Sequence, residues 1–319
     1  MKIRPNEQTA RMHYNLQRWM IGLDMTETDE QLIAYTAFLA RHLQPEALYF
    51  VHSPDDLEVP EAVRKELYQT DQPLDEYFKS QMQEKVAKYF DSEATEHEIA
   101  YKVTEGSPLP ALLHWSQVKD VDLILVGRKQ TLKGSGVIPK RLARRSACSI
   151  LFVPETFPIQ LREIIVGVDF SENSQRALGQ ALSLAEQVEN CGVLVHNVYE
   201  VPQGYHTSGK SFEEFGEIMK GHARKRYDTF IKKVDTREVR VQPAFALSQE
   251  KKPAQTFCKS AVEHEADLML ITSRGRTRFA ALLLGSFAES MVMEDAQVPM
   301  LILKNKNKNM GVLDALLNV

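Results

Sequence analysis

The sequence predicts an α/β protein made of two tandem, doubly wound parallel sheets of five strands each. Three observations predict this fold class. Short apolar runs alternate with amphipathic helical segments, as in parallel sheets covered on both faces. Four strand motifs recur in the same order at roughly 145 positions, which is a domain-sized period. The length of 319 residues also fits two domains of ~150 residues each.

The recurring motifs predict a tandem duplication. Residues 19–26 match 165–171, 48–52 match 192–196, 121–127 match 266–272, and 150–154 match 300–303. We therefore expect domains at 14–155 and 161–304, joined by a proline-containing linker at 155–160. A C-terminal tail at 305–319 follows, and its apolar end either docks on a partner or frays.

Each half begins with an apolar strand that ends in an aspartate, Asp24 or Asp169. An amphipathic helix follows at 29–43 and at 174–189. Residues with capping chemistry precede or open it: Thr26, Thr28, Ser171 and Asn173. A second strand then ends in a histidine, His52 or His196.

The rest of each half repeats the same programme. A long, charged, mostly helical segment is expected at 60–90 and at 212–234, and a third strand near 98–103 and 238–246. Pro108 and Pro253 stand where the next helix starts, a position that tolerates proline. A fourth strand, a last helix and a fifth strand close each half.

The fourth strand of the second half leads into a loop that resembles an anion site. Leu268 to Ile271 form a buried apolar strand, Gly275 permits a turn, and Gly285-Ser286 opens a helix. If Ser286 caps that helix, the free N–H groups and the helix dipole attract an anion. Three arginines, Arg274, Arg276 and Arg278, add positive charge. An exposed basic loop with an ordinary helix cap explains the same residues.

Composition excludes several function classes. The formal net charge of −4 disfavours nucleic acid and acidic membranes as partners. No apolar run approaches ~20 residues, and the first residues lack the apolar core of a signal peptide. The cysteines Cys148, Cys191 and Cys258 have no metal-ligand spacing, which favours reduced, mostly buried thiols. We therefore expect a cytoplasmic protein.

No catalytic or metal-binding constellation stands out. His52 and His196 lack a second ligand at helical spacing, so we expect partly buried, hydrogen-bonded histidines. Asp24 and Asp169 could serve as general bases, but no nucleophile lies near them in sequence. Asp122 precedes its strand and, like Asp267, is expected in a helix–strand turn. The chain has no zinc spacing, no nucleophile elbow and no Walker motif.

From about Trp19 to Lys304 the chain resembles the universal stress protein family, as two tandem domains. The most specific feature is that family's nucleotide loop, Gly-x2-Gly-x9-Gly-Ser/Thr, which appears here as Thr272-x2-Gly275-x9-Gly285-Ser286. The opening of the second half, from Val168 to Leu178, is also similar. The resemblance implies an adenine nucleotide alpha hydrolase-like fold, with the two halves packed as an intramolecular pseudo-dimer through their last strands.

The resemblance implies that ATP, with or without magnesium, binds the second domain. Asp169, with Phe170 beside it and the backbone near Asn197, would hold the adenine and ribose side. Backbone N–H groups around the ribose and phosphates would come from Thr272, Gly275, Arg276, Gly285, Ser286 and Phe287. Thr272 replaces the family's first glycine, so its Cβ either crowds the ribose or its hydroxyl donates a hydrogen bond.

The first domain departs further from the family. Its loop after Gly127 is shorter and lacks the second glycine, although Gly134-Ser135-Gly136 can form an anion-binding nest. With Asp24 these residues make a candidate second anion site, and a degenerate site with a solvated basic face is the alternative.

Three hypotheses for function follow. The first is a cytoplasmic stress-response sensor or regulator that binds ATP in the second domain without fast catalysis. The second is a nucleotide-free interaction scaffold, and the third is a slow ATP-hydrolysing or adenylating enzyme. A homodimer of whole chains and a protein partner of unknown identity remain open.

Overall fold

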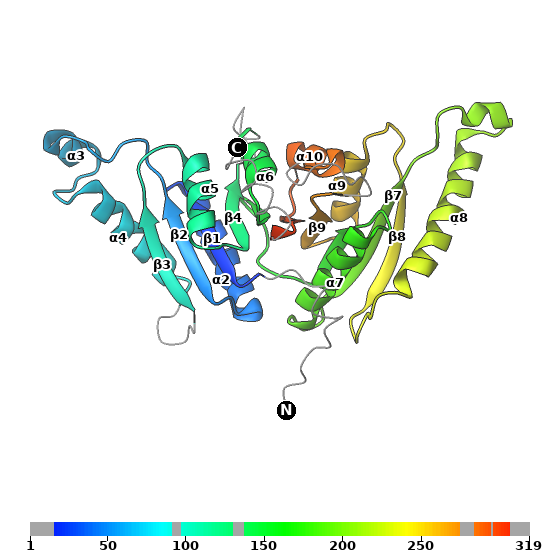
Figure 1. Cartoon of the computed structure of the whole chain (residues 1–319), viewed down its shortest axis with the longest axis horizontal. Helices are drawn as coiled ribbons and strands as arrows, with labels where there is room; N and C mark the ends of the chain where they lie inside the picture. The colour runs from blue at the N-terminus through cyan, green and yellow to red at the C-terminus, as the bar shows by residue number, and fades with distance from the viewer. Residues whose placement is uncertain (1–15, 91–96, 130–136, 275–283, 295, 307–319) are drawn as a thin grey trace, which may run out of the picture. The chain divides into compact units, whose positions relative to one another are not determined.

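The computed structural model describes residues 16–90, 97–129, 137–274, 284–294 and 296–306. The chain divides into two compact units between residues 159 and 160. Each unit contains one five-stranded parallel sheet with helices on both faces, as the sequence predicts (Figure 1). The pseudo-dimer packing stays a prediction.

The first unit has the strand order β3-β2-β1-β4-β5. Its strands are β1 (Arg18–Leu23), β2 (Ala47–His52), β3 (Glu98–Val103), β4 (Leu123–Arg128) and β5 (Ser149–Pro154). Helices α2 (Thr28–Leu43) and α4 (Leu74–Ala87) pack together on one face, and α5 (Pro108–Val118) and α6 (Val137–Arg145) on the other. The short α3 (Glu61–Leu67) buries none of its residues.

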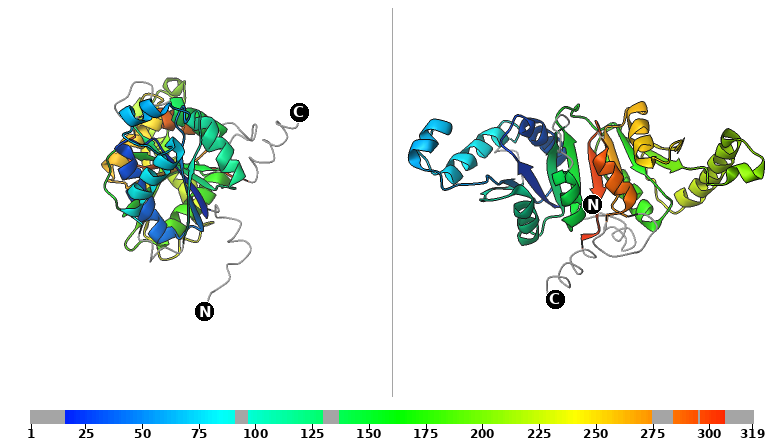
Figure 2. Two further views of the ribbon diagram at one scale, coloured as in Figure 1. Left: turned by 90° about the vertical axis from the view of Figure 1, so that its left-hand side faces the viewer. Right: turned by 90° about the horizontal axis from the view of Figure 1, so that it is seen from above.

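The second unit repeats this arrangement with the order β10-β9-β6-β7-β8. Its strands are β6 (Glu163–Gly167), β7 (Gly192–Tyr199), β8 (Val241–Leu247), β9 (Leu268–Thr272) and β10 (Met300–Leu303). Helices α7 (Glu172–Glu186) and α8 (Phe212–Ile231) cover one face, and α9 (Pro253–Glu263) and α10 (Ser286–Met293) cover the other (Figure 2). A 3-10 turn, η1 (Tyr205–Ser208), precedes α8.

Buried apolar side chains hold the strands, and two buried aspartates anchor their starts. Every residue of β2, β5 and β10 is buried, which explains their near-continuous apolar sequences. Asp267 accepts hydrogen bonds from the backbone N–H groups of Arg162, at 2.6 Å, and Glu163, at 3.1 Å. Asp122 accepts from Gln17 and Arg18 in the same way. The expected turn aspartates are therefore clamps between neighbouring strands.

The starts of α5, α7 and α9 follow the predicted chemistry, and the start of α2 does not. Ser171 caps α7 by accepting from the Ser174 N–H at 3.2 Å, and α5 and α9 begin at their prolines. In α2 the expected threonine cap is wrong. The N-cap position is Glu27, with no side-chain hydrogen bond, because the Thr26 hydroxyl bonds to Asp24 Oδ1 instead.

The structural repeat corrects the sequence alignment of the second strands by one residue. Leu23 pairs with His52 in the first sheet, whereas Gly167 pairs with His196 in the second. His52 is therefore equivalent to Asn197, and the residue equivalent to His196 is Val51. The third strand of the second unit also begins later than predicted, at Val241.

Cys148 and Cys191 are buried, and Cys258 is half-buried. Burial, with the nearby charges of Glu163 and Asp267, raises the pKa of Cys191 to about 12. None of the helices in the described ranges is long and apolar enough to cross a membrane.

Candidate functional site

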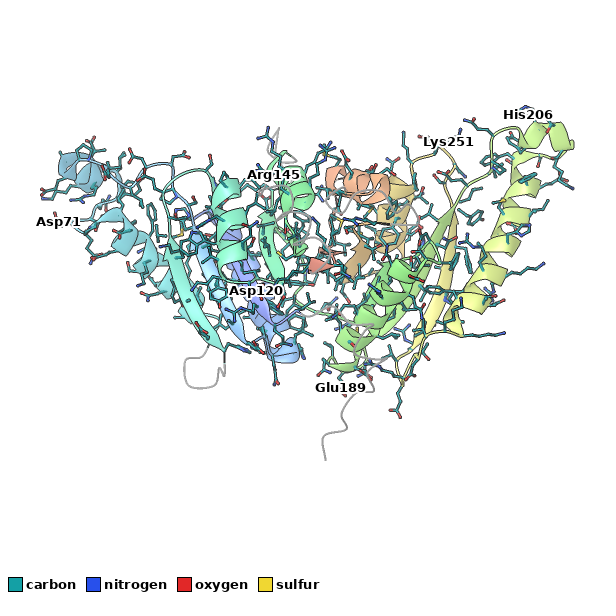
Figure 3. All side chains as sticks on the ribbon, viewed as in Figure 1. Asp71, Asp120, Arg145, Glu189, His206 and Lys251 are labelled. Carbon is teal, nitrogen blue, oxygen red and sulfur yellow. The ribbon has the colours of Figure 1, made fainter. Side chains whose placement is uncertain are left out.

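A pocket opens in the second unit where the strand order reverses, between β6 and β9. In open α/β sheets this point, beyond the carboxyl ends of the strands, is where ligands bind. The pocket volume is about 310 Å³, within the ~300–1,000 Å³ typical of ligand sites. In Figure 3, Glu189 lies at the opposite end of this unit, where the strands begin, and Lys251 lies at the carboxyl end.

Residues from three strands, three helices and the loops between them line this pocket. They are Gly167, Val168, Asp169, Ser174, His196, Asn197, Val198, Pro253, Phe257, Ile271, Thr272, Ser273, Arg274, Gly285, Ser286, Phe287 and Ala288. The structure thus brings together six of the predicted ATP-site residues: Asp169, Asn197, Thr272, Gly285, Ser286 and Phe287.

Asp169 is held in place by the start of α7. Its Oδ1 atom accepts from the Ser171 N–H at 3.0 Å and from the Ser174 hydroxyl at 2.5 Å. The Ser174 hydroxyl also accepts from the Asp169 N–H at 3.0 Å. This network fixes the carboxylate at the mouth of the pocket before any ligand arrives.

Two other predicted residues have different surroundings from those expected. Phe170 does not line the pocket: its ring packs edge-on against Phe230 of α8 and beneath the Arg226 guanidinium. Its φ of 64° turns the chain away from β6. Asn197 does line the pocket, but its side-chain amide donates to the Val168 carbonyl at 2.7 Å, which ties β7 to the end of β6.

The start of α10 offers backbone donors to the pocket. Gly285 is the N-cap residue and Ser286 the first helical residue, so the prediction that Ser286 caps this helix is wrong. No side chain caps α10 in the part of the chain that the structure describes. The Gly285 N–H donates to the Ser273 carbonyl at 2.7 Å, which fastens the helix start to the end of β9. The first-turn N–H groups and the helix dipole therefore favour an anion here.

The Thr272 hydroxyl has a local hydrogen-bond partner. Its hydroxyl donates to the Arg274 carbonyl at 2.7 Å, so it shapes the turn after β9. Asn173 of α7 donates to the same carbonyl at 3.3 Å. A hydrogen bond from Thr272 to a ribose would have to break this turn.

Several predicted site residues lie outside the described ranges. They are Gly275, Arg276 and Arg278 in the second half, and Gly134, Ser135 and Gly136 in the first. Among the residues that are described, no group of three or more histidine, cysteine or acidic side chains can hold a metal ion.

The inner end of the pocket is apolar and contains a residue that sequence analysis did not assign to the site. His196 is 1% exposed, and its ring packs edge-on against Phe257 at 5.3 Å between centroids. Phe257 in turn contacts the ring of Phe287 at 5.9 Å. Burial, with a smaller effect of His264, lowers the pKa of His196 to about 4, so the imidazole is neutral at physiological pH.

The first unit has its own pocket, of about 840 Å³, at the equivalent place. Gly127 and Asp24 line it. The Lys129 ammonium forms an ion pair with the Asp24 carboxylate at 2.6 Å across the gap between β4 and β1. Burial by itself would raise the pKa of Asp24. The ion pair with Lys129 and the hydrogen bonds from Thr26 outweigh this effect and lower the pKa. A nucleotide placed as in the second domain would have to displace this ion pair.

A second carboxylate makes the first pocket more acidic than its counterpart. Asp29 takes the place that Ser174 has in the second unit, because its Oδ1 atom accepts from the Asp24 N–H at 3.1 Å. Burial raises the pKa of Asp29 to about 6, and Lys85 lies 3.4 Å away. Asp55 also lines this pocket. The charges of the described lining residues therefore disfavour the anion predicted for this site.

Comparisons with known proteins agree with the fold. The model of the universal stress protein family matches residues 15–154 and again residues 160–304. Universal stress protein MJ0577 of Methanocaldococcus jannaschii is 22% identical over 163 residues, which are 47% of this chain and 98% of that protein.

Two solved structures share the two-domain architecture. A putative universal stress protein from Pseudomonas aeruginosa is 14% identical and covers 97% of this chain and 99% of its own, with a TM-score of 0.63. A universal stress protein from Archaeoglobus fulgidus is 14% identical and covers 92% of this chain and 98% of its own, with a TM-score of 0.59. At this identity the likeness shows the fold alone.

Proposed function

The chain belongs to the universal stress protein family, and on that premise we propose that its second domain, residues 161–304, binds an adenine nucleotide. The proposed ligand is ATP, and the protein acts in the cytoplasm as a stress-response sensor or regulator. The first domain, residues 14–155, takes no part in nucleotide binding in this proposal, because the Asp24–Lys129 ion pair spans its equivalent site.

One observation carries the proposal. A fixed carboxylate, an uncapped helix start and an apolar inner wall converge on one pocket at the reversal point of the sheet. These three features match the three parts of a nucleotide. The apolar wall suits the base, Asp169 suits the ribose hydroxyls as an acceptor, and the N–H groups of α10 suit the phosphates.

The same pocket supports a sensor better than an enzyme. Phosphoryl transfer needs a group that positions the nucleophile and acidic ligands for magnesium. Asp169 is the only carboxylate among the described lining residues, and α7 already donates two hydrogen bonds to it. Magnesium would therefore arrive with the nucleotide, held mainly by phosphates and water. Slow hydrolysis and adenylation remain the enzymatic alternatives.

Two measurements on the purified full chain test the proposal. We expect small molecules extracted from it to include an adenine nucleotide, and we expect ATP with magnesium to bind in calorimetry. Absence of both would favour the nucleotide-free scaffold. Turnover well above ~1 per second, the usual enzyme range, would favour the enzymatic alternative.

A substitution at the helix start tests the location of the site. Gly285 has φ −63° and ψ 150°, which a leucine adopts without strain, so Gly285→Leu adds a side chain where the phosphates would lie. We expect ATP to bind about a hundredfold more weakly or not at all.

Gly221→Leu is the matched control for this change. Gly221 lies on α8, outside the pocket, where a Cβ meets no atom within 4 Å. This variant should bind ATP as the unaltered protein does. Equal affinity in the Gly285 and Gly221 variants would place the nucleotide elsewhere.

A further inference from the structure

The inner wall of the second pocket contains a buried polar atom that needs a partner. Nδ1 of His196 is buried and has no hydrogen-bond partner among the residues that the structure describes. A buried donor or acceptor left in this state destabilises the folded chain. His196 also lines the pocket, so a ligand that enters can supply the missing partner.

The equivalent strand ends elsewhere are satisfied, which makes His196 an exception. Asn197, the next residue, donates to the Val168 carbonyl, and Nδ1 of His52 lies 3.0 Å from the Leu23 carbonyl. These two bonds close the ends of the strands and need no ligand. The Nδ1 atom of His196 forms no comparable bond between strands among the described residues, and it lies in the wall of the pocket.

The surroundings of His196 specify the kind of ligand. Phe257 and Ile271 form apolar walls beside it, and the imidazole itself is uncharged. Gly167 permits this close packing, because a Cβ there would lie 3.2 Å from Ile271 and 3.3 Å from Phe257. A neutral imidazole nitrogen donates or accepts one hydrogen bond according to its tautomer. A flat, uncharged heteroaromatic ring with polar atoms on its edge fits this end of the pocket, and a phosphate does not.

Resting on the proposed function, we infer that His196 recognises the base of the bound nucleotide through a hydrogen bond from or to Nδ1, with the base against Phe257. The base then lies at the inner end of the pocket and the phosphates at the start of α10. His196 is accordingly a specificity-determining residue of the second domain.

The first domain lacks this recognition device. Val51 occupies the place of His196, since it pairs with Gly22 as His196 pairs with Gly167. Leu112 occupies the place of Phe257, with its methyl groups 3.2 and 3.3 Å from a Cβ at Gly22. At these two positions the first pocket therefore has aliphatic side chains, and Val51 has no polar side-chain atom to contact a base. The two pockets therefore differ at the position that would contact a base, in addition to their different charges.

The decisive variant is His196→Val, which installs the residue of the first domain. We expect the Kd for ATP with magnesium to rise about tenfold to a hundredfold, the range of one buried hydrogen bond to a ligand. Binding of inorganic triphosphate, which has no base, should stay the same. The free variant should unfold at the same temperature or higher, because an unsatisfied buried atom has been removed.

His264→Val is the matched control. His264 is the exposed C-cap residue that follows α9 and does not line the pocket, so this variant should bind both probes normally. A change in ATP affinity equal to that of the His196 variant would overturn the inference.

A spectroscopic measurement on the unaltered chain covers the case in which His196→Val does not fold. The ¹⁵N resonance of His196 Nδ1 should shift on addition of adenosine and not on addition of triphosphate. No shift with adenosine would mean that Nδ1 finds another partner, such as water, and would overturn the inference.

The outcomes separate this inference from the proposed function. If the unaltered protein binds no ATP, the proposed function fails and the inference fails with it. If it binds ATP and His196→Val binds it equally well, only the inference fails. If the variant weakens ATP and triphosphate alike, the damage is general and the base contact is refuted.

Discussion

Acid should affect the two domains with opposite sign. One buried side chain in each unit has a pKa shifted by about two pH units or more within the acidic range: His196, with a pKa of about 4, and Asp29, with a pKa of about 6. Their ordinary values are 6.5 and 3.8. Between pH 7 and pH 4 the folded chain and the unfolded chain therefore bind different numbers of protons at these two groups, so the free energy of unfolding changes with pH.

Through His196, lowering the pH destabilises the second domain. Between pH 6.5 and pH 4 the unfolded chain binds a proton at this histidine and the folded second domain does not. The free energy of unfolding therefore has its full value above pH 6.5 and decreases as the pH falls to 4. The gap of about 2.5 pH units corresponds to about 3 kcal/mol in the free energy of unfolding.

Through Asp29, lowering the pH stabilises the first domain. Its carboxylate is buried, so above pH 6 the folded first domain bears the cost of the charge. As the pH falls from 6 to 3.8 the folded state takes up a proton before the unfolded state does, and the cost disappears. The gap of about two pH units corresponds to about 3 kcal/mol, a net value that already includes the attraction of Lys85.

Hydrogen exchange with mass spectrometry, as a function of urea and pH, distinguishes the two domains. Peptides from β7 report the second domain and peptides from β2 the first. His196→Val should remove most of the acid sensitivity of β7, and Asp29→Asn should remove the acid stabilisation of β2. Subtracting the pH dependence of each variant from that of the unaltered chain removes the contribution of the other titrating groups, which both chains share. Unchanged pH dependence in both variants would refute the assigned burial of these side chains.

Three further changes have expected outcomes. Asp267→Ala removes three hydrogen bonds, from Arg162, Glu163 and Gln160, and should destabilise the second domain by about 2–4 kcal/mol in urea unfolding; Asp267→Asn, which keeps an acceptor, should lose less. Ser211→Ala removes the capping box of α8 and should cost about 1 kcal/mol in the same assay, and no loss would mean that this box does not form in solution. Cys191 should resist iodoacetamide at pH 8 in the folded protein, because burial suppresses its thiolate. Its modification at the rate of an unfolded control would contradict the buried position.

The sequence alone determined the elements and their order. Runs such as Leu268 to Ile271 are apolar throughout and suit a parallel strand covered on both faces, so these runs and the repeat predict two doubly wound sheets. Proline and serine at helix starts act through their own backbone and side chain, and Pro108, Pro253 and Ser171 behave as predicted. Local chemistry of this kind does not depend on the rest of the chain.

Tertiary structure decided what the polar residues do. Thr26 and Ser286 have the chemistry of helix caps, but Thr26 bonds to Asp24 and Ser286 lies one residue inside its helix. His52 and His196 look alike in sequence, since each ends an apolar strand. Nδ1 of His52 is hydrogen-bonded to the end of β1, whereas Nδ1 of His196 has no partner among the described residues, because the two histidines differ by one residue in register. Side chains alternate between the two faces of a strand, so a shift of one residue moves a histidine from the strand end to the wall of the site.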